Sequence, residues 1–270
     1  MSVLRYIESL TLANTPVTDF DQPQLFEPTA VFRGVTPEPP TAPSPVVPAS
    51  PIPDDLKAAV DVGSLLSFVA GVSAEEKDDV LFSVQLAQRA ASGEFDRFGQ
   101  TENWYRKYLE VLEAVGWATE QFAFSEYAQS EGEFRMDKAA LAIVTAIATQ
   151  NQLAVLTEAI HALESLAEGD GTIRLFDLHS AAQASGNFQI GAVQKAGNEA
   201  LSMALGAFHF RSNDARRRFL FFAWGAKDVA FWTSAKKLTL NTDLYAGLRT
   251  AVKEKLGVAA RNYIGGLNLQ

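Results

Sequence analysis

The chain has few residues that could carry out acid–base or nucleophilic chemistry. One stretch, Asp177-Leu178-His179-Ser180, places an acid, a base and a hydroxyl group together in sequence. Catalytic triads are usually assembled from residues that are distant in the chain. We therefore expect these side chains to cap a helix or to make loop hydrogen bonds. An enzyme with an unfamiliar site around His179 is the third of three functional hypotheses.

The residue types that bind metals and cofactors are also sparse. The chain has no cysteine, and no two of its three histidines, His161, His179 and His209, have the helical i, i+4 spacing of a zinc site. The glycine-rich phosphate and dinucleotide motifs and the nucleophile elbow are missing from the sequence. We predict no catalytic residue, no cofactor and no metal site, and we favour a non-enzymatic protein.

Basic residues gather near the C-terminal end of the sequence. Residues 201–270 contain 11 basic and 4 acidic residues, whereas the first 200 contain 12 basic and 28 acidic. Arg216, Arg217 and Arg218 follow a predicted turn, where we expect exposure. They could form a solvated turn, or they could bind an acidic protein surface or an anionic membrane. The acidic composition and the lack of a recognition module argue against nucleic acid as the partner.

The elements that must position these residues begin after a proline-rich segment. All eleven prolines lie between Pro16 and Pro53, which predicts an extended arm over residues 1–53. The arm is either a spacer or a docking segment. We favour docking because the arm carries more apolar residues than a solvated tail needs, with candidate interaction residues Leu4, Tyr6, Ile7, Phe20, Phe26 and Phe32.

Residues 54–170 show mainly helical spacing of apolar residues. The spacing predicts helices over 54–69, 74–90, 101–127 and 137–167. Ser73 and Glu76 form a capping box that predicts the start of the second helix. Gly93 is expected to end it.

Residues 171–270 have strand-like patterns followed by a helix. We expect short strand pieces at 172–176 and 188–190, a hairpin of 202–211 with 217–224, and a further strand over 229–240. Asn241 is expected to cap a helix that ends at Gly257. The aromatic strands are interpreted as buried beneath the helices, although a lipid or ligand surface is the alternative.

Together these patterns predict an α+β fold. It has an extended proline-rich arm, a helical layer, an antiparallel β-meander and a C-terminal helix. The predicted regions are 1–53, 54–170 and 171–270, and residues 54–270 are expected to form one folded unit.

The leading hypothesis is a protein-interaction or structural protein that self-associates through its N-terminal arm, with other copies of itself as partners. The alternative is a secreted toxin or virulence-type effector that acts at membranes. No secretory signal or membrane span is recognised in the sequence. The chain is therefore expected to be cytoplasmic or exported by a route without such a signal.

Overall fold

The computed structural model describes residues 2–13, 56–128, 132–257 and 264–267. The helices are α1 (Val3–Ser9), α2 (Ala74–Glu94), α3 (Thr101–Ala114), α4 (Met136–Thr145), α5 (Gln150–Ser165), α6 (Gly171–Ser180), α7 (Thr242–Ala246) and α8 (Arg249–Leu256). The strands are β1 (Ala58–Asp61), β2 (Ser64–Phe68), β3 (Trp117–Ala118), β4 (Ser125–Glu126), β5 (Glu133–Phe134), β6 (Ala181–Ala182), β7 (Ser185–Lys195), β8 (Leu201–Ser212), β9 (Trp224–Gly225), β10 (Val229–Leu240) and β11 (Ile264–Leu267). This is a mixed α+β fold.

One twisted sheet organises the described residues. Its strands run in the order β11-β1-β2-β7-β8-β10-β3, and β4 also pairs with β10. Every pairing is antiparallel except that of β2 with β7. The long strands β7, β8 and β10 form the antiparallel meander at its centre. Because β1 and β2 join the same sheet, segments on both sides of residue 170 build it.

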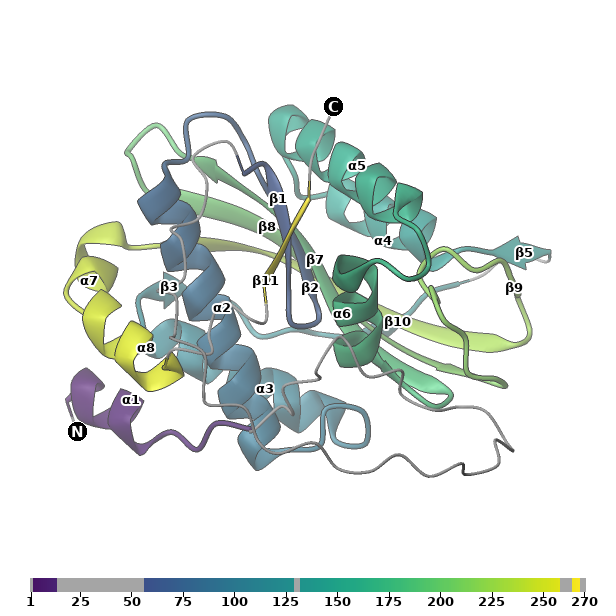
Figure 1. Cartoon of the computed structure of the whole chain (residues 1–270), viewed down its shortest axis with the longest axis horizontal. Helices are drawn as coiled ribbons and strands as arrows, with labels where there is room; N and C mark the ends of the chain where they lie inside the picture. Colours follow the sequence, from purple (N-terminus) through teal and green to yellow (C-terminus); the bar gives the residue numbers. More distant parts are fainter. Residues whose placement is uncertain (1, 14–55, 129–131, 258–263, 268–270) are drawn as a thin grey trace, which may run out of the picture.

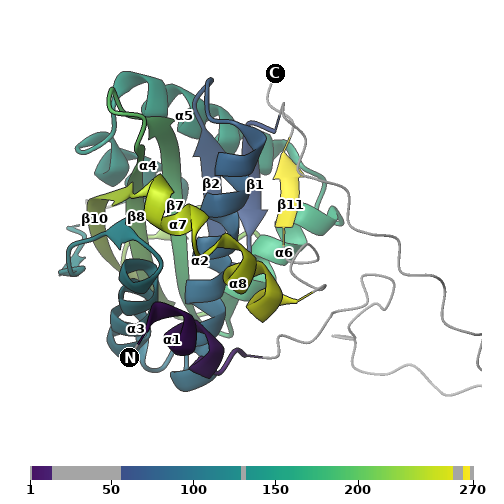
Figure 2. The ribbon, with the colours of Figure 1, turned by 90° about the vertical axis from the view of Figure 1, so that its left-hand side faces the viewer.

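Helices cover both faces of the sheet (Figures 1 and 2). One face packs against α4, α5 and α6, and we call it the aromatic face because Phe188, Phe208 and Phe231 lie at its centre. The opposite face packs against α2 and α3, with α1 and α8 outside them. Successive strand residues alternate between the faces, as the pleat requires. The expectation that the aromatic strands are buried beneath helices holds for Phe231 on β10, whereas the predicted aromatic strand at 217–224 is largely a turn in which Phe222 is 37% exposed.

The N-terminal segment 2–13 packs against its own chain. Ile7 is buried among the side chains of the α2–α3 layer. The hydroxyl group of Tyr6 donates a hydrogen bond of 2.6 Å to Glu110 on α3, and Leu4 is 47% exposed. Of the predicted interaction residues of the arm, Phe20, Phe26 and Phe32 lie outside the described residues, as does the proline-rich segment.

Predictions based on caps and on central strands are confirmed. Ser73 and Glu76 make both hydrogen bonds of the capping box at the start of α2. The strand over 229–240 is β10, and Asn241 caps α7 through its side chain. The single helix expected between Asn241 and Gly257 is divided into α7 and α8, and Gly257 ends α8 with a positive φ of 73°.

The predicted helix over 54–69 is wrong, because β1 and β2 form a hairpin there. All nine residues of these two strands are buried. A strand that is covered on both faces has a continuous apolar run, and such a run lacks the alternation that distinguishes it from a helix. The predicted strand at 172–176 is also wrong, because this segment belongs to helix α6. Asp170 accepts a hydrogen bond from the Thr172 backbone and starts helix α6.

Other predicted elements have different lengths or partners. The helix expected over 101–127 ends at Ala114, and Gly116 follows with a φ of 108°. The helix expected over 137–167 is divided into α4 and α5, and a capping box at Thr149 starts the second one. Residues 217–224 are not the strand partner of β8, because β8 pairs with β7 and β10 over its whole length.

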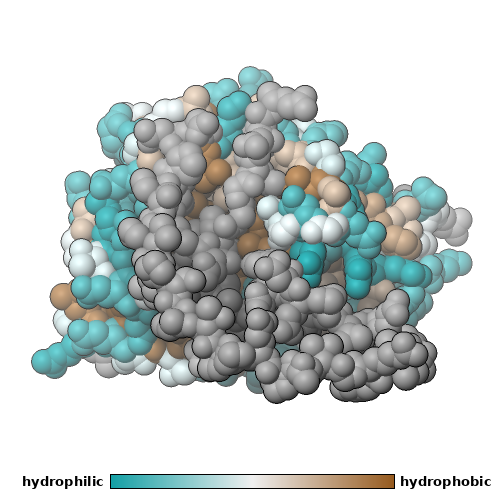
Figure 3. Space-filling model, in the orientation of Figure 1, coloured by the Kyte–Doolittle hydropathy of each residue, from teal (hydrophilic) through white to brown (hydrophobic). Residues whose placement is uncertain are grey.

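None of the helices in the described part of the chain is both long and apolar enough to cross a bilayer. Within the described residues, the large apolar side chains that are exposed are Leu4, Leu178, Phe222 and Leu244. On the side drawn in Figure 3, hydrophobic residues outside the grey segments form separate small areas among hydrophilic ones.

Candidate functional site

The loop between β8 and β9, residues 213–223, carries the three consecutive arginines. Arg217 points into solvent, with 75% of its side chain exposed, and its guanidinium group lies 3.8 Å from Glu168. The guanidinium group of Arg216 lies 4.9 Å from the ring centre of Phe222 and forms an exposed ion pair with Asp214. Phe222 is itself 37% exposed. Arg216, Arg217 and Phe222 therefore form a basic and aromatic surface, here called the basic loop surface.

Arg218 has a different environment from its two neighbours. Its backbone N–H donates a 2.8 Å hydrogen bond to Asp177 on α6. Its guanidinium group donates to the backbone carbonyls of Leu166 and Glu164 at the end of α5. Its φ of 53° is unusual for a residue with a Cβ atom. Arg218 thus ties the loop to two helices, whereas the sequence predicted exposure for all three arginines.

The sequence stretch from Asp177 to Ser180 lies on the last turn of α6. Burial raises the pKa of Asp177 to about 6, and the hydrogen bond from Arg218 opposes that rise. Burial, together with the charge of Arg97, lowers the pKa of His179 to about 4. Ser180 is fully buried, and adjacent positions on a helix point in different directions. Within the described residues, the buried Oδ1 atom of Asp177 and the buried Oγ atom of Ser180 have no hydrogen-bond partner.

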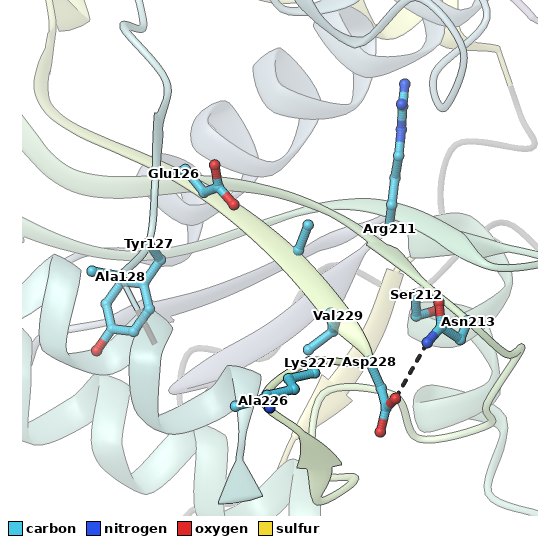
Figure 4. A pocket seen from close by; sticks show the side chains of 11 residues that line it. Glu126, Tyr127, Ala128, Arg211, Ser212, Asn213, Ala226, Lys227, Asp228 and Val229 are labelled. Carbon is cyan, nitrogen blue, oxygen red and sulfur yellow. Dashed lines mark hydrogen bonds between the residues drawn. The ribbon is translucent and has the colours of Figure 1, made fainter. Parts of the chain in front are cut away.

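A second feature lies close to the basic loop surface, at the end of β8 and β10. It is a hollow of about 730 Å³, which we call the strand-end pocket. Its lining comes from β4 and the residues after it, from the end of β8, and from the β9–β10 turn with the start of β10 (Figure 4). The lining residues are Glu126, Tyr127, Ala128, Arg211, Ser212, Asn213, Ala226, Lys227, Asp228, Val229 and Ala230.

Strand register explains why distant charged residues share this pocket. Glu126 is paired with Trp232 on one side of β10, and Arg211 is paired with Ala230 on the other. Directly paired residues point to the same face of a sheet, and so do residues two positions apart on one strand. Glu126 and Arg211 therefore lie on one face. The sequence analysis missed this site because Glu126 is 85 positions away from Arg211 in the chain.

Inside the molecule, a cluster of polar side chains lies between the sheet and the α2–α3 layer. Arg97 is buried and donates hydrogen bonds to the side-chain oxygens of Gln88 and Gln189 at 3.0 and 3.3 Å. Asp61 accepts a hydrogen bond from Gln85 at 3.0 Å. Burial raises the pKa of Asp61 well above its ordinary value. This buried polar cluster has no counterpart in the predicted site residues.

Among the residues that the structure describes, no group of three or more histidine, aspartate or glutamate side chains is placed to hold an ion. The basic loop surface and the strand-end pocket both carry charged side chains and aromatic rings. Both lie at the end of the sheet where β8 and β10 meet their connecting turns.

The chain was compared with known proteins by sequence and by structure. No protein-family model matches it, and no curated protein matches its sequence. A solved structure described as a delta-endotoxin has 12% identity and a TM-score of 0.38, covering 80% of this chain and 96% of its own. The activated Cyt2Ba monomer from Bacillus thuringiensis subsp. israelensis has 11% identity and a TM-score of 0.41, covering 67% and 97%.

A third solved structure is that of the Evf virulence factor. It has 10% identity and a TM-score of 0.34, and the match covers 81% of this chain and 86% of the other. The chain is thus weakly similar in structure to a protein named as a delta-endotoxin, to the activated Cyt2Ba monomer and to a protein named as a virulence factor.

Proposed function

We propose that this protein is a membrane-acting protein of toxin or virulence type that attaches to anionic lipid surfaces through its basic loop surface. The observation that carries the proposal is the exposed ring of Phe222 beneath the guanidinium group of Arg216, next to the exposed Arg217. The three weakly similar solved structures have TM-scores of 0.34–0.41 and lend the proposal no weight. The proposal is supported by the basic loop surface.

The chemistry of the surface suits the boundary between lipid headgroups and acyl chains. An aromatic ring gains by partial burial at that boundary, while a guanidinium group next to it can stay with the phosphates. Each basic residue near an anionic bilayer contributes roughly 1 kcal/mol of attraction. The acidic neighbours Asp214 and Glu168 are both exposed, and exposed ion pairs contribute only about 0 to 1 kcal/mol. Lipid phosphates could replace them at little cost.

The rest of the molecule favours contact at the membrane surface as the first step. The phenylalanine rings of β7, β8 and β10 are buried, and so is the inner side of α4 and α5. Leu178, which is 50% exposed, lies on α6 next to Asp177, the residue that holds the loop at Arg218. The exposed residues of this region are therefore the ones available to a bilayer without any change of fold.

Vesicle flotation tests the attachment, and dye leakage tests the toxin-like action. The double variant R216S/R217S should lose at least tenfold in binding to vesicles that contain anionic lipid, and F222S should also weaken it. Binding of the unchanged protein should weaken as salt rises past about 0.15 M, where charges are screened beyond about 8 Å.

The matched controls lie elsewhere on the surface. Arg106 and Lys237 are exposed and form no ion pair within the described residues, so R106S/K237S removes the same charge. L244S removes an exposed apolar side chain from α7. Equal losses in test and control variants would disprove the assignment of the surface. Attachment without leakage would support the membrane contact and refute toxin action.

Two further proposals come from the sequence alone. Self-association through the N-terminal arm would require that deletion of residues 1–53 lowers the mass measured by light scattering. Export without a Sec signal would require that the protein appears outside the producing cells when its N-terminus is intact. An unchanged mass, or full retention in the cells, would contradict the respective proposal.

A further inference from the structure

A second hollow, of about 470 Å³, lies between helices α4 and α5, and we call it the α4–α5 groove. The two helices lie side by side and are joined by the short turn 146–149 (Figure 1). Four lining residues of α4 and four of α5 each have the spacing i, i+3, i+4, i+7 of one helix face. The lining residues are Arg135, Asp137, Lys138, Leu141, Ala142, Thr145, Thr157, Ile160, His161 and Glu164.

The middle of the groove and its end near the turn are apolar. Ile160 is buried, and Leu141 packs against the same apolar core. The hydroxyl groups of Thr145 and Thr157 each donate a hydrogen bond to the backbone carbonyl four residues earlier in their own helix, at 2.7 and 2.8 Å. These two donors are therefore already used, and a ligand in this part of the groove meets mainly apolar atoms.

The opposite end of the groove carries its charged side chains. The guanidinium group of Arg135 contacts both carboxylates of the lining, at 2.8 Å to Asp137 and 2.6 Å to Glu164. Lys138 and His161 are exposed, and within the described residues neither side chain forms a hydrogen bond or an ion pair. The carboxylates are thus neutralised by Arg135, whereas the ammonium of Lys138 is available to a ligand.

We propose that the α4–α5 groove binds a single-chain aliphatic carboxylic acid. The ammonium of Lys138 and a ring N–H of His161 can both donate hydrogen bonds to its carboxylate. The tail then lies along Leu141, Ala142 and Ile160, where its burial is favourable. The groove therefore offers one polar end and one apolar end, as a ligand with a single charged head and an apolar tail requires.

The dimensions of the groove favour a tail of medium length. The lining of α4 extends from Lys138 to Thr145, and that of α5 from Thr157 to Glu164. Each stretch has a length of about 10 Å at the helical rise of about 1.5 Å per residue. The volume of about 470 Å³ lies in the lower part of the range of about 300 to 1,000 Å³ that small-molecule sites occupy. The groove therefore suits one short chain and not the two long chains of a phospholipid.

This inference goes beyond the membrane attachment proposed above and uses none of its residues. The basic loop surface consists of Arg216, Arg217 and Phe222, and none of these lines the α4–α5 groove. R216S/R217S should therefore lose vesicle attachment and still bind the acid, and the two proposals can fail separately.

Isothermal titration calorimetry of the full chain with decanoate, below the concentration at which the acid forms micelles, tests the proposal. Decanoate should bind at least tenfold more tightly than decyltrimethylammonium, which has the same tail and the opposite charge, and also more tightly than decanol. Acetate should not bind measurably. From butanoate to decanoate, the affinity should rise about twofold to fourfold per methylene, because full burial of a methylene corresponds to a factor of about four.

Variants of the full chain locate the two ends of the ligand. K138Q should weaken decanoate binding about threefold to fivefold and leave decanol binding unchanged, because one exposed charge pair is lost. K138E should reverse the preference, so that decyltrimethylammonium binds more tightly than decanoate. A142F should abolish binding of all three decyl compounds by filling the groove. The matched controls K237Q and A246F change an exposed lysine and an exposed alanine outside the groove and should have no effect.

Circular dichroism and thermal melts should show that these variants are folded, because every substituted residue is exposed. Equal affinity for decanoate and decyltrimethylammonium would overturn the proposal, and so would decanoate binding that K138E and A142F both leave intact. A complete lack of decanoate binding would also overturn it. If A142F then lowers the mass measured by light scattering, the groove holds a second copy of the chain instead.

Discussion

The two faces of the sheet are both covered by helices, but different interactions hold their helices in place. On the aromatic face, the rings of Phe188 and Phe208 are stacked at 5.1 Å, and those of Phe208 and Phe231 at 5.6 Å. All three rings are fully buried beneath α4, α5 and α6. Apolar burial and ring packing dominate there, and these do not depend on pH.

The opposite face has an apolar core that surrounds the buried polar cluster. Gly63 allows the guanidinium group of Arg97 to lie against the backbone, because a Cβ atom at position 63 would be 2.4 Å from that group. Arg97 also donates to the backbone carbonyl of Asn187 at 3.2 Å. Burial lowers the pKa of Arg97 to about 10 and raises that of Asp61.

Equal burial of the two faces does not imply an equal response of stability to mutation or pH. Apolar contacts can be lost gradually, because each methylene that is removed costs a fraction of the total. Buried polar groups depend on complete sets of partners, because each group that loses its hydrogen bond keeps its full desolvation penalty. The aromatic face should therefore respond to the volume of a substitution and the polar face to its hydrogen-bonding capacity.

The largest expected effect is that of F208A at the centre of the aromatic face. The free energy of unfolding should fall by about 3 to 5 kcal/mol, because a fully buried ring is removed and a cavity remains. Urea denaturation at pH 5 and pH 8 should give the same loss. F222A, at an exposed ring, is the control and should change stability by less than about 0.5 kcal/mol. A loss that varies strongly with pH would contradict the comparison.

A somewhat smaller effect is expected for R97M on the polar face. Methionine fills much of the arginine volume but leaves the oxygens of Gln88, Gln189 and Asn187 without their donor. Stability should fall by about 2 to 4 kcal/mol. Thermal and urea unfolding measure it. If R97M is as stable as the unchanged protein, the polar cluster contributes no more than an apolar core would, and the two faces are equivalent.

The buried carboxyl of Asp177 gives an effect that depends on pH. Its pKa of about 6 exceeds the ordinary value of 3.8, so the folded state binds the proton more tightly than the unfolded state. Its contribution to stability is therefore complete below about pH 4 and is lost as pH rises through 6. D177N should match the unchanged protein at pH 4 and exceed it by roughly 1 to 3 kcal/mol at pH 8. A difference that is greatest at low pH would reverse this sign.

The smallest effect is expected outside both faces. R216S/R217S should change the melting temperature by no more than a few degrees, because exposed ion pairs contribute about 0 to 1 kcal/mol. R218S should be clearly more destabilising, because it removes the donors to the carbonyls at the end of α5. Differential scanning calorimetry of both variants compares them directly. Similar melting temperatures would show that Arg218 is no different from its neighbours.

The sequence predicted those parts of the fold that depend on local chemistry. The capping box at Ser73, the cap at Asn241 and the strand over 229–240 each follow from residues within a few positions. The region at 54–69 could not be recognised as strands, because its pattern reflects burial on both faces by distant helices. Of the candidate site, the basic loop was recognised from its three arginines. The pocket was not, because pairing between strands brings its residues together.

The sequence by itself determined the mixed α+β character, the confinement of proline to the first 53 residues and the placement of basic charge near the C-terminal end. These features depend on composition and local backbone preference. Only the tertiary structure decided that Arg218 turns inward while Arg216 and Arg217 stay exposed, and that Glu126 and Arg211 share one face. The physical reason is that strand register and helix docking are set by the burial of the whole sheet, to which residues far apart in the chain contribute together.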